Sequence, residues 1–221
     1  MNLFNLSRRQ FMPATLLAMA NVIEVSGMTN TEGRKNFFFL NEKFTEESFL
    51  MMKPVLDDYA EAHIVYDLKK LRTAEIMAEL TQQDTGFIDG FLYILNLDEK
   101  EKNRISHSLL MALSDVSDIV LYFKKKYNRP RPSEILPSID PILKVPSHKS
   151  YPSGHAAQAM AAARLLSAWT TGLDKDLYKL AKKVGRNREI AGLHYPSDTN
   201  AGFILGEKIA QLILKENNVQ L

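Results

Sequence analysis

The segment GHAAQAMAAARLLSAW, residues 154–169, decides the predicted fold. It is rich in alanine and apolar on nearly every side, which is typical of a helix packed closely among other helices. Pro152 and Ser153 come directly before it and favour a helix that begins at about Gly154. We therefore expect a central helix over residues 154–169 in an all-α protein.

A second helix is expected over residues 105–123, where apolar residues recur at alternating spacings of four and three. Residues 54–70 and 198–215 also show helical periodicity, whereas the proline-rich stretch 128–141 is expected to be mostly loop. No run alternates as a strand does. These patterns predict a compact helical bundle. The stripe of the second helix consists of Ile105, Leu109, Ala112, Val116, Ile119 and Phe123.

Composition limits the function classes. The chain has 221 residues and 45% hydrophobic content, enough for one substantial core, and we take residues 27–221 as a single domain. Its 28 basic and 26 acidic residues leave a net charge of +2, which argues against a protein built mainly to coat nucleic acid. Without cysteine, a disulfide, a thiolate zinc site and a cysteine nucleophile are excluded.

The N-terminus suggests a location. SRRQFM, residues 7–12, precedes an apolar stretch over 12–23 and a small-x-small pattern at 18–20, so residues 1–26 resemble a twin-arginine export signal. The alternative is a short amphipathic helix. No later segment supplies the eighteen or more apolar residues of a membrane span. We therefore expect a soluble mature chain, periplasmic or secreted.

The first chemical motif is KKKYNRPRP, residues 124–132. Lys124 ends the second expected helix, and Arg131 follows seven positions later in the proline-rich loop. Two cations could therefore converge on one anion. The alternative is a solvated basic helix end, which suits the negative end of the helix dipole.

The second motif is PSGH, residues 152–155. A helix that begins here points the unpaired N–H groups of Ser153 and Gly154 outward, where they can bind an oxyanion. His155, in the first turn, could protonate a departing oxygen. The alternative is an ordinary capped helix.

The third motif is NREIAGLHYPSD, residues 187–198. Pro196 interrupts the helix, so we expect a helix that ends near His194 and a new one that begins near Asp198. At such a corner Asp198 can accept the Nδ1–H of His194 and leave Nε2 free as a nucleophile. The alternative is an N-cap aspartate beside a core histidine.

Together the three motifs resemble, in order and spacing, the signature of the type 2 phosphatidic acid phosphatase superfamily. That signature is lysine, six residues and Arg-Pro, then Pro-Ser-Gly-His, then Ser-Arg, five residues, His, three residues and Asp. Within it, the chain looks similar to the soluble class A non-specific acid phosphatases, while vanadium haloperoxidases share the same pocket. Two features depart from the pattern: Asn187 replaces the serine, and the usual disulfide is missing.

The resemblance implies an all-α bundle of the acid phosphatase/vanadium haloperoxidase type and a metal-independent phosphomonoesterase that forms a phosphohistidine. No cofactor or metal is expected. A vanadate-dependent haloperoxidase and a non-catalytic phosphate- or phospholipid-binding module are the alternatives. The implied catalytic residues are His155 as acid and base, His194 as nucleophile and Asp198 to orient it, and the implied phosphate-binding residues are Lys124, Arg131, Ser153, Gly154 and Arg188.

The resemblance also bears on partners. It implies a phosphorylated small molecule or lipid as substrate and no binding of nucleic acid. A transmembrane span is not expected in the mature chain, and assembly into a homo-oligomer stays open.

Overall fold

The computed structural model describes residues 39–40, 49 and 57–217, and this part of the chain is helical without a strand. The export-signal prediction for residues 1–26 lies outside the described residues. The elements in chain order are α2 (Asp58–Asp67), η4 (Leu68–Leu71), α3 (Ala74–Leu95), α4 (Glu99–Tyr127), α5 (Pro132–Ile135), η5 (Pro137–Ile139), α6 (Gly154–Trp169), α7 (Asp174–Ile190) and α8 (Pro196–Glu216). The predicted all-α class is confirmed.

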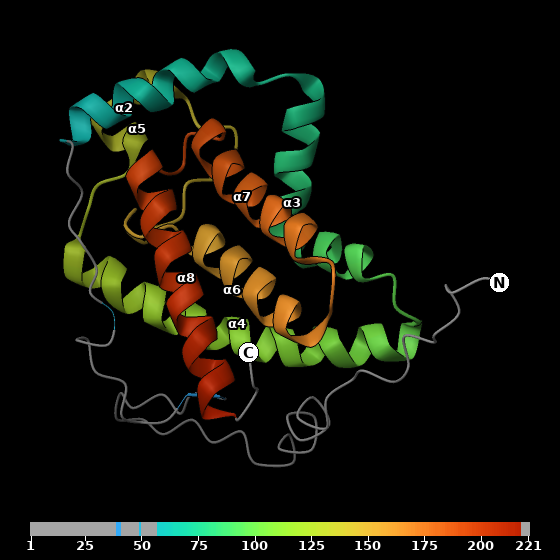
Figure 1. Ribbon diagram of the computed structural model, residues 1–221. Coiled ribbons are helices and arrows are strands. Elements are labelled where there is room, and N and C mark those ends of the chain that lie inside the picture. Colours follow the sequence, from blue (N-terminus) through green and yellow to red (C-terminus); the bar gives the residue numbers. More distant parts are fainter. Residues whose placement is uncertain (1–38, 41–48, 50–56, 218–221) are drawn as a thin grey trace.

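Helix α6 lies at the centre of the bundle, packed against α4, α7 and α8 (Figure 1). The Ser153 side chain caps its first turn by accepting the Ala156 N–H at 3.4 Å. All of its alanines except Ala168 are fully buried, because neighbouring helices contact it on several sides. The bounds predicted from the sequence, 154–169, are those of the structure.

Helix α8 approaches α6 closely through two glycines one turn apart. A Cβ on Gly202 would lie 2.5 Å from the Ser153 carbonyl oxygen, and one on Gly206 would overlap the Ala157 carbonyl group. Only glycine permits this backbone contact. It brings the first turn of α8 against the first turn of α6, where two of the sequence motifs lie.

Helix α4 runs across the bundle beneath α6 and α8 (Figure 1). All six residues of its predicted stripe are buried. The helix ends at Asn128, whose left-handed backbone (φ 48°) turns the chain into the proline-rich segment. That segment is mostly loop, as predicted, with only α5 and η5 in it.

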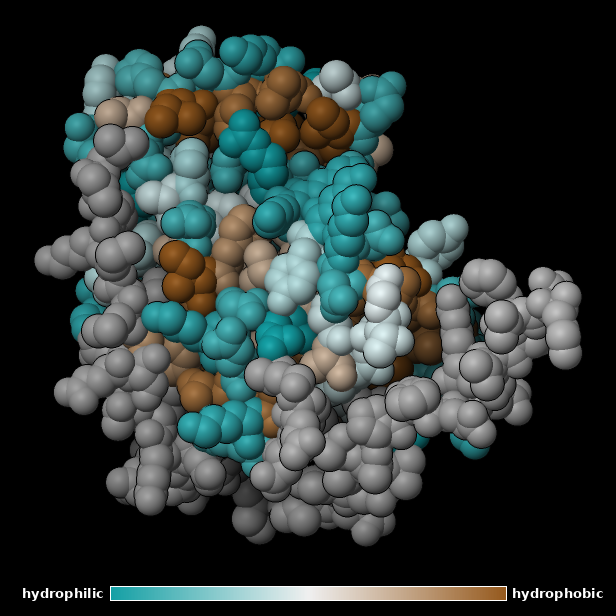
Figure 2. Space-filling view, viewed as in Figure 1, coloured by the Kyte–Doolittle hydropathy of each residue, from teal (hydrophilic) through white to brown (hydrophobic). Residues whose placement is uncertain are grey.

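The prediction that no segment could span a membrane was wrong. The stretch Glu99–Ile135, which contains α4, is long and apolar enough to cross a membrane by length and composition. Half of its apolar window is buried inside the bundle. On the face shown in Figure 2, polar side chains surround several separate apolar patches.

The prediction of a soluble chain in the periplasm or secreted was wrong for the same reason. That prediction required a chain with no segment able to span a membrane, and α4 lies within such a candidate segment. Sequence inspection missed it because the polar residues of the exposed face interrupt the apolar run of α4.

Candidate active site

The three sequence motifs meet at one end of the bundle. They come from the end of α4, the loop before α5, the starts of α6 and α8, and the end of α7. Backbone and side-chain hydrogen bonds join these segments, as described below. The six charged or histidine side chains predicted for the site therefore belong to one cluster rather than to separate surfaces.

His194 and Asp198 form the predicted pair in the turn between α7 and α8. His194 Nδ1 lies 3.1 Å from Asp198 Oδ2, and both side chains are buried. Helix α7 ends at Ile190, slightly earlier than predicted, and Gly192 makes the turn with a left-handed backbone (φ 83°). Because a carboxylate only accepts hydrogen bonds, the His194 proton lies on Nδ1, and Nε2 carries the lone pair.

The electrostatics of this pair favour a neutral imidazole beside an ionised carboxylate. Burial, followed by the charge of Lys124, lowers the pKa of His194 to about 3. Burial alone would raise the pKa of Asp198, but the hydrogen bond from His194, the charge of Arg129 and the hydrogen bond from Ser150 lower it. A neutral, oriented imidazole is the form that can act as a nucleophile.

Lys124 lies buried at the end of α4. Its Nζ donates to the carbonyl oxygens of Lys149 and Ser150, both at 2.8 Å. Burial and the neighbouring charge of Arg131 lower its pKa to about 7. The alternative of a solvated basic helix end therefore holds for Lys125 and Lys126, which are exposed, and not for Lys124.

Arg131 lies beside the nucleophile candidate. Its Nη1 donates to the Leu193 carbonyl at 2.7 Å and lies 3.5 Å from Nε2 of His194. On its other side, Nη2 lies 3.1 Å from Nδ1 of His148, an exposed histidine. The position in front of His194 Nε2 is therefore next to a guanidinium.

Arg188 is held by α3. It donates from Nη1 to Asp84 Oδ1 at 2.8 Å and from Nη2 to the Leu80 carbonyl at 2.9 Å. Its buried Nε has no hydrogen-bond partner among the described residues. A buried guanidinium N–H without a partner is a donor available to a bound anion.

The start of α6 matches the predicted anion-binding site at only one of its two backbone N–H groups. The N–H of Ser153 donates to the Asp198 carbonyl at 3.0 Å, so it is engaged within the protein. The N–H of Gly154, in the first helical position, has no acceptor within the helix. Gly154 therefore keeps the anion-binding geometry predicted for this helix start.

His155, the next residue, lies between α6 and α3. Its Nε2 is 3.4 Å from the Asp84 carbonyl oxygen, and its ring centroid is 5.8 Å from that of Phe87. Burial, then the charge of Arg188, lower the pKa of His155 to about 4. A dianion bound beside it would favour the imidazolium and raise this pKa.

Two residues that hold this cluster in place, Asp84 and Arg129, were not predicted from the sequence. Helix α3 supplies Asp84, the partner of Arg188, although it lies 104 positions away. Asn187, the departure from the family pattern, donates from Nδ2 to Gln83 on the same helix at 2.8 Å, which gives this residue a structural contact. The second of the two is Arg129, which lies two residues before Arg131 and donates a hydrogen bond to Asp198.

Comparison with known proteins identifies the family. The model of the PAP2 superfamily matches residues 105–218, which include all three motifs. The chain belongs to the PAP2 superfamily. The predicted resemblance, and its relation to the vanadium haloperoxidases, is thereby confirmed.

Curated relatives include both chemistries of this superfamily. The chain is 23% identical over 224 residues to a vanadium-dependent bromoperoxidase of Corallina officinalis, covering 81% of this chain and 37% of the relative. It is 35% identical over 95 residues to a decaprenylphosphoryl-5-phosphoribose phosphatase of Mycobacterium tuberculosis, strain ATCC 25618 / H37Rv, covering 43% of this chain and 51% of the relative. The chain thus spans about a third to a half of the length of these relatives.

Two solved structures share the fold. A bacterial vanadium-dependent iodoperoxidase matches with a TM-score of 0.60 at 17% identity, over 75% of this chain and 51% of that one. LpxE of Aquifex aeolicus matches with a TM-score of 0.53 at 24% identity, over 69% of this chain and 93% of that one. The PAP2 superfamily chain described here therefore shares its fold with both of these structures.

Proposed function

We propose that this PAP2 superfamily chain is a phosphatase that hydrolyses phosphate monoesters through a phosphohistidine at His194. The observation that carries the proposal is the geometry of His194: Nδ1 is 3.1 Å from the Asp198 carboxylate, and Nε2 is 3.5 Å from the Arg131 guanidinium. A neutral imidazole so oriented has its lone pair directed to where an anion would bind.

Substrate binding would use the buried cations. Arg131 and Arg188 would donate to the non-bridging phosphoryl oxygens, the latter through its unpartnered Nε, and Lys124 would add a third charge. The Gly154 N–H at the start of α6 would add a neutral donor. These groups neutralise the charge that develops on the phosphoryl oxygens in the transition state.

Two chemical steps would follow. His194 Nε2 attacks phosphorus, the bond to the ester oxygen breaks, and His155 in its protonated form gives its proton to that oxygen. Neutral His155 then takes a proton from water, whose oxygen attacks phosphorus. The P–N bond breaks, His194 returns to its neutral form and phosphate leaves.

Metal independence is part of the proposal, because the cations of the protein would supply the electrostatic stabilisation. The test is release of phosphate from an aryl phosphate by the purified chain, with and without a chelator. We expect equal rates in both conditions, and loss of turnover in His194→Ala. His107→Ala, on the exposed side of α4, is the matched control and keeps its activity.

The same assay separates this proposal from the alternatives. A non-catalytic module would bind inorganic phosphate but release none from esters. Turnover that survives His194→Ala, or that the chelator abolishes, would contradict the mechanism. For the substrate, one relative is named for a decaprenylphosphoryl-5-phosphoribose. We accordingly propose a phosphorylated small molecule or lipid, and a panel of both would rank them.

A vanadate-dependent haloperoxidase is the second candidate, favoured by the alignment with the bromoperoxidase over 81% of this chain. The residues fit vanadate as they fit phosphate, since Arg188 has a buried donor without a partner among the described residues and His194 Nε2 carries a lone pair beside the Arg131 guanidinium. Bound vanadate would supply activation of peroxide for halide oxidation. Bromide or iodide oxidation by the vanadate-treated protein with hydrogen peroxide, and no phosphate release before treatment, would favour this candidate.

A further inference from the structure

Arg129 is a buried cation that the mechanism above does not use. It lies between α4 and α5, beneath the start of α8, and is 5% exposed. Its Nη1 donates to Asp198 Oδ1 at 2.7 Å. This is the carboxylate oxygen that does not face His194, so Arg129 and His194 hold the two oxygens of one carboxylate.

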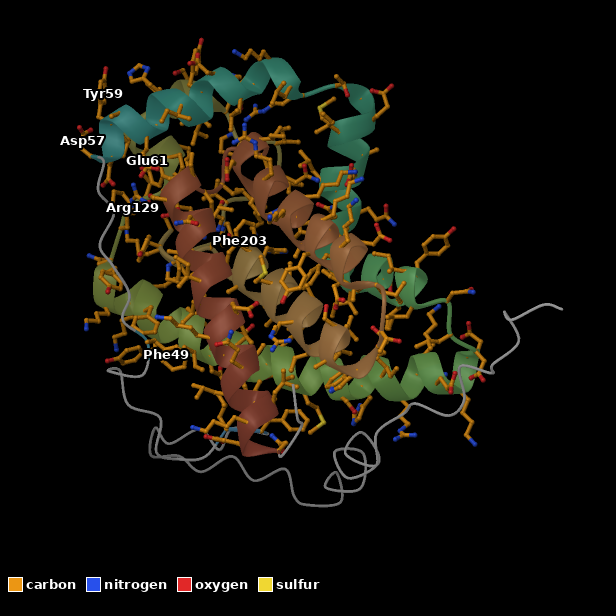
Figure 3. All side chains as sticks on the ribbon, in the orientation of Figure 1. Phe49, Asp57, Tyr59, Glu61, Arg129 and Phe203 are labelled. Atoms are coloured by element: carbon orange, nitrogen blue, oxygen red, sulfur yellow. The ribbon has the colours of Figure 1, made fainter. Side chains whose placement is uncertain are left out.

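The other side of the guanidinium is held by α2. Arg129 donates from Nη2 to Glu61 at 2.6 Å and from Nε to Asp58 at 2.8 Å. Glu61 also accepts the backbone N–H of Ser197 at 3.0 Å, so the same carboxylate is bonded to the first turn of α8. Figure 3 shows Glu61 and Arg129 together where α2 passes the start of α8.

Two further contacts fix the plane and the backbone of Arg129. The guanidinium carbon lies 3.8 Å from the ring centroid of Tyr195, which is fully buried. The Arg129 carbonyl accepts the Ser150 N–H at 3.0 Å, and the Ser150 hydroxyl donates to Asp198 Oδ2. Arg129 therefore acts on both oxygens of Asp198, on one directly and on the other through Ser150.

The charges show why a guanidinium is needed there. Asp198 and Glu61 are both buried, and each accepts a hydrogen bond from Arg129. Without the cation, two buried carboxylates would face each other and Asp198 would move or take up a proton. The planar fork of arginine reaches several acceptors at once, and an ammonium group cannot do so in the same geometry.

We propose that Arg129, fixed by Glu61 of α2, is a positioning residue for phosphoryl transfer: it holds the Asp198 carboxylate in the orientation that aims His194 at phosphorus. Arg129 does not touch the substrate and acts through Asp198. The inference rests on the proposed role of His194 as nucleophile. It extends the catalytic assembly to α2, which lies outside the three motifs and the family match.

The experiment compares Arg129→Lys and Glu61→Gln with Arg164→Met. Arg164 pairs with Glu207 at 3.1 Å between α6 and α8, so its loss controls for removal of a partly buried ion pair. For an aryl phosphate we expect kcat per folded molecule to fall about 10- to 100-fold in Arg129→Lys and Glu61→Gln. This is the loss typical of removing a residue that orients a functional group from behind. We expect KM to change by less than about threefold, and Arg164→Met to keep its kcat.

A second readout does not depend on turnover. The His194 Nδ1 proton in its bond to Asp198 gives a downfield proton resonance, assigned by its loss in His194→Asn. Arg129→Lys and Glu61→Gln should shift this resonance, and Arg164→Met should leave it in place. The double variant of Arg129 and Glu61 should lose little more kcat than either single one, because both act through Asp198.

The outcomes separate the two proposals. Absence of phosphate release by the unmutated chain overturns the proposed function, and the resonance then decides alone whether Arg129 orients the pair. Normal kcat with an unmoved resonance in both variants overturns the inference. A rise in KM at constant kcat overturns it as well, since that would place Arg129 in substrate binding.

Discussion

Lys124 should set the alkaline limit of activity. Its pKa is lowered to about 7 by burial and by the charge of Arg131, and only its protonated form attracts a phosphate dianion. Because the proton is lost as pH rises through this value, kcat/KM should be constant below it and fall above it. At pH 8, about one Lys124 in eleven stays charged, so kcat/KM should be about tenfold below its plateau, with a further tenfold per unit.

The acid limit should belong to His194. Its pKa of about 3 means that the imidazole is neutral above that pH, so the profile should be bell-shaped with its plateau on the acid side of neutrality. An aryl phosphate is the suitable substrate. Its leaving group is already acidic, so the protonation state of His155 has little effect on the first step.

The assay is the pH profile of kcat/KM in the unmutated chain and in Lys124→Arg. Arginine stays charged throughout the range, so the limit near pH 7 should disappear even if the plateau is lower. Both proteins are assayed with the same substrate, so the ionisation of the substrate affects both pH profiles equally. Lys125→Arg, at the neighbouring exposed position, should keep the original profile. The same alkaline limit in Lys124→Arg would refute the reasoning.

Three other predictions concern single contacts. His194→Ala should form no phosphoprotein from a phosphorus-labelled aryl phosphate, whereas His155→Ala should accumulate base-stable label after an alkaline quench, because it is stalled in hydrolysis. Gly206→Ala should lower the free energy of unfolding by about 1–3 kcal/mol, measured in urea, since its methyl group would overlap the Ala157 carbonyl. Asn187→Ser should cost a similar amount, about 1–3 kcal/mol, because it leaves a buried amide oxygen on α3 without its donor.

The labelling prediction and the stability predictions each have a check. Label that maps to a residue other than His194 in the unmutated chain would show that the nucleophile is assigned incorrectly. Gln211→Ala, on the exposed side of α8, should leave the urea midpoint nearly unchanged. Unaltered stability in Gly206→Ala would mean that α8 can move away from α6 without cost.

The sequence predicted those parts of the molecule whose signals are local. Helix α6 was predicted with its bounds because Ser153 caps it and its composition differs from that of its flanks. The pairing of His194 with Asp198 was predicted because Pro196 forces a corner within four residues. In both cases the relevant forces act within one or two helical turns.

The parts that were missed depend on contacts between distant segments. Asp84 reaches Arg188 from 104 positions away, and Glu61 reaches Arg129 from 68 positions away. Neither acidic residue differs from a surface carboxylate in its own neighbourhood of the sequence. The Ser153 N–H was expected to be free, because the approach of α8 that engages it depends on glycines some 50 residues later.

The contact between the first turns of α6 and α8 has a consequence for altering this protein. The bond from the Ser153 N–H to the Asp198 carbonyl ties the helix that carries His155 to the helix that orients His194. In the proposed mechanism the attacking side and the leaving-group side therefore form one connected body, and neither should be shifted to suit a new ester without disturbing the other. A change of substrate preference is better sought on α3, where Phe87 borders His155 without belonging to that body.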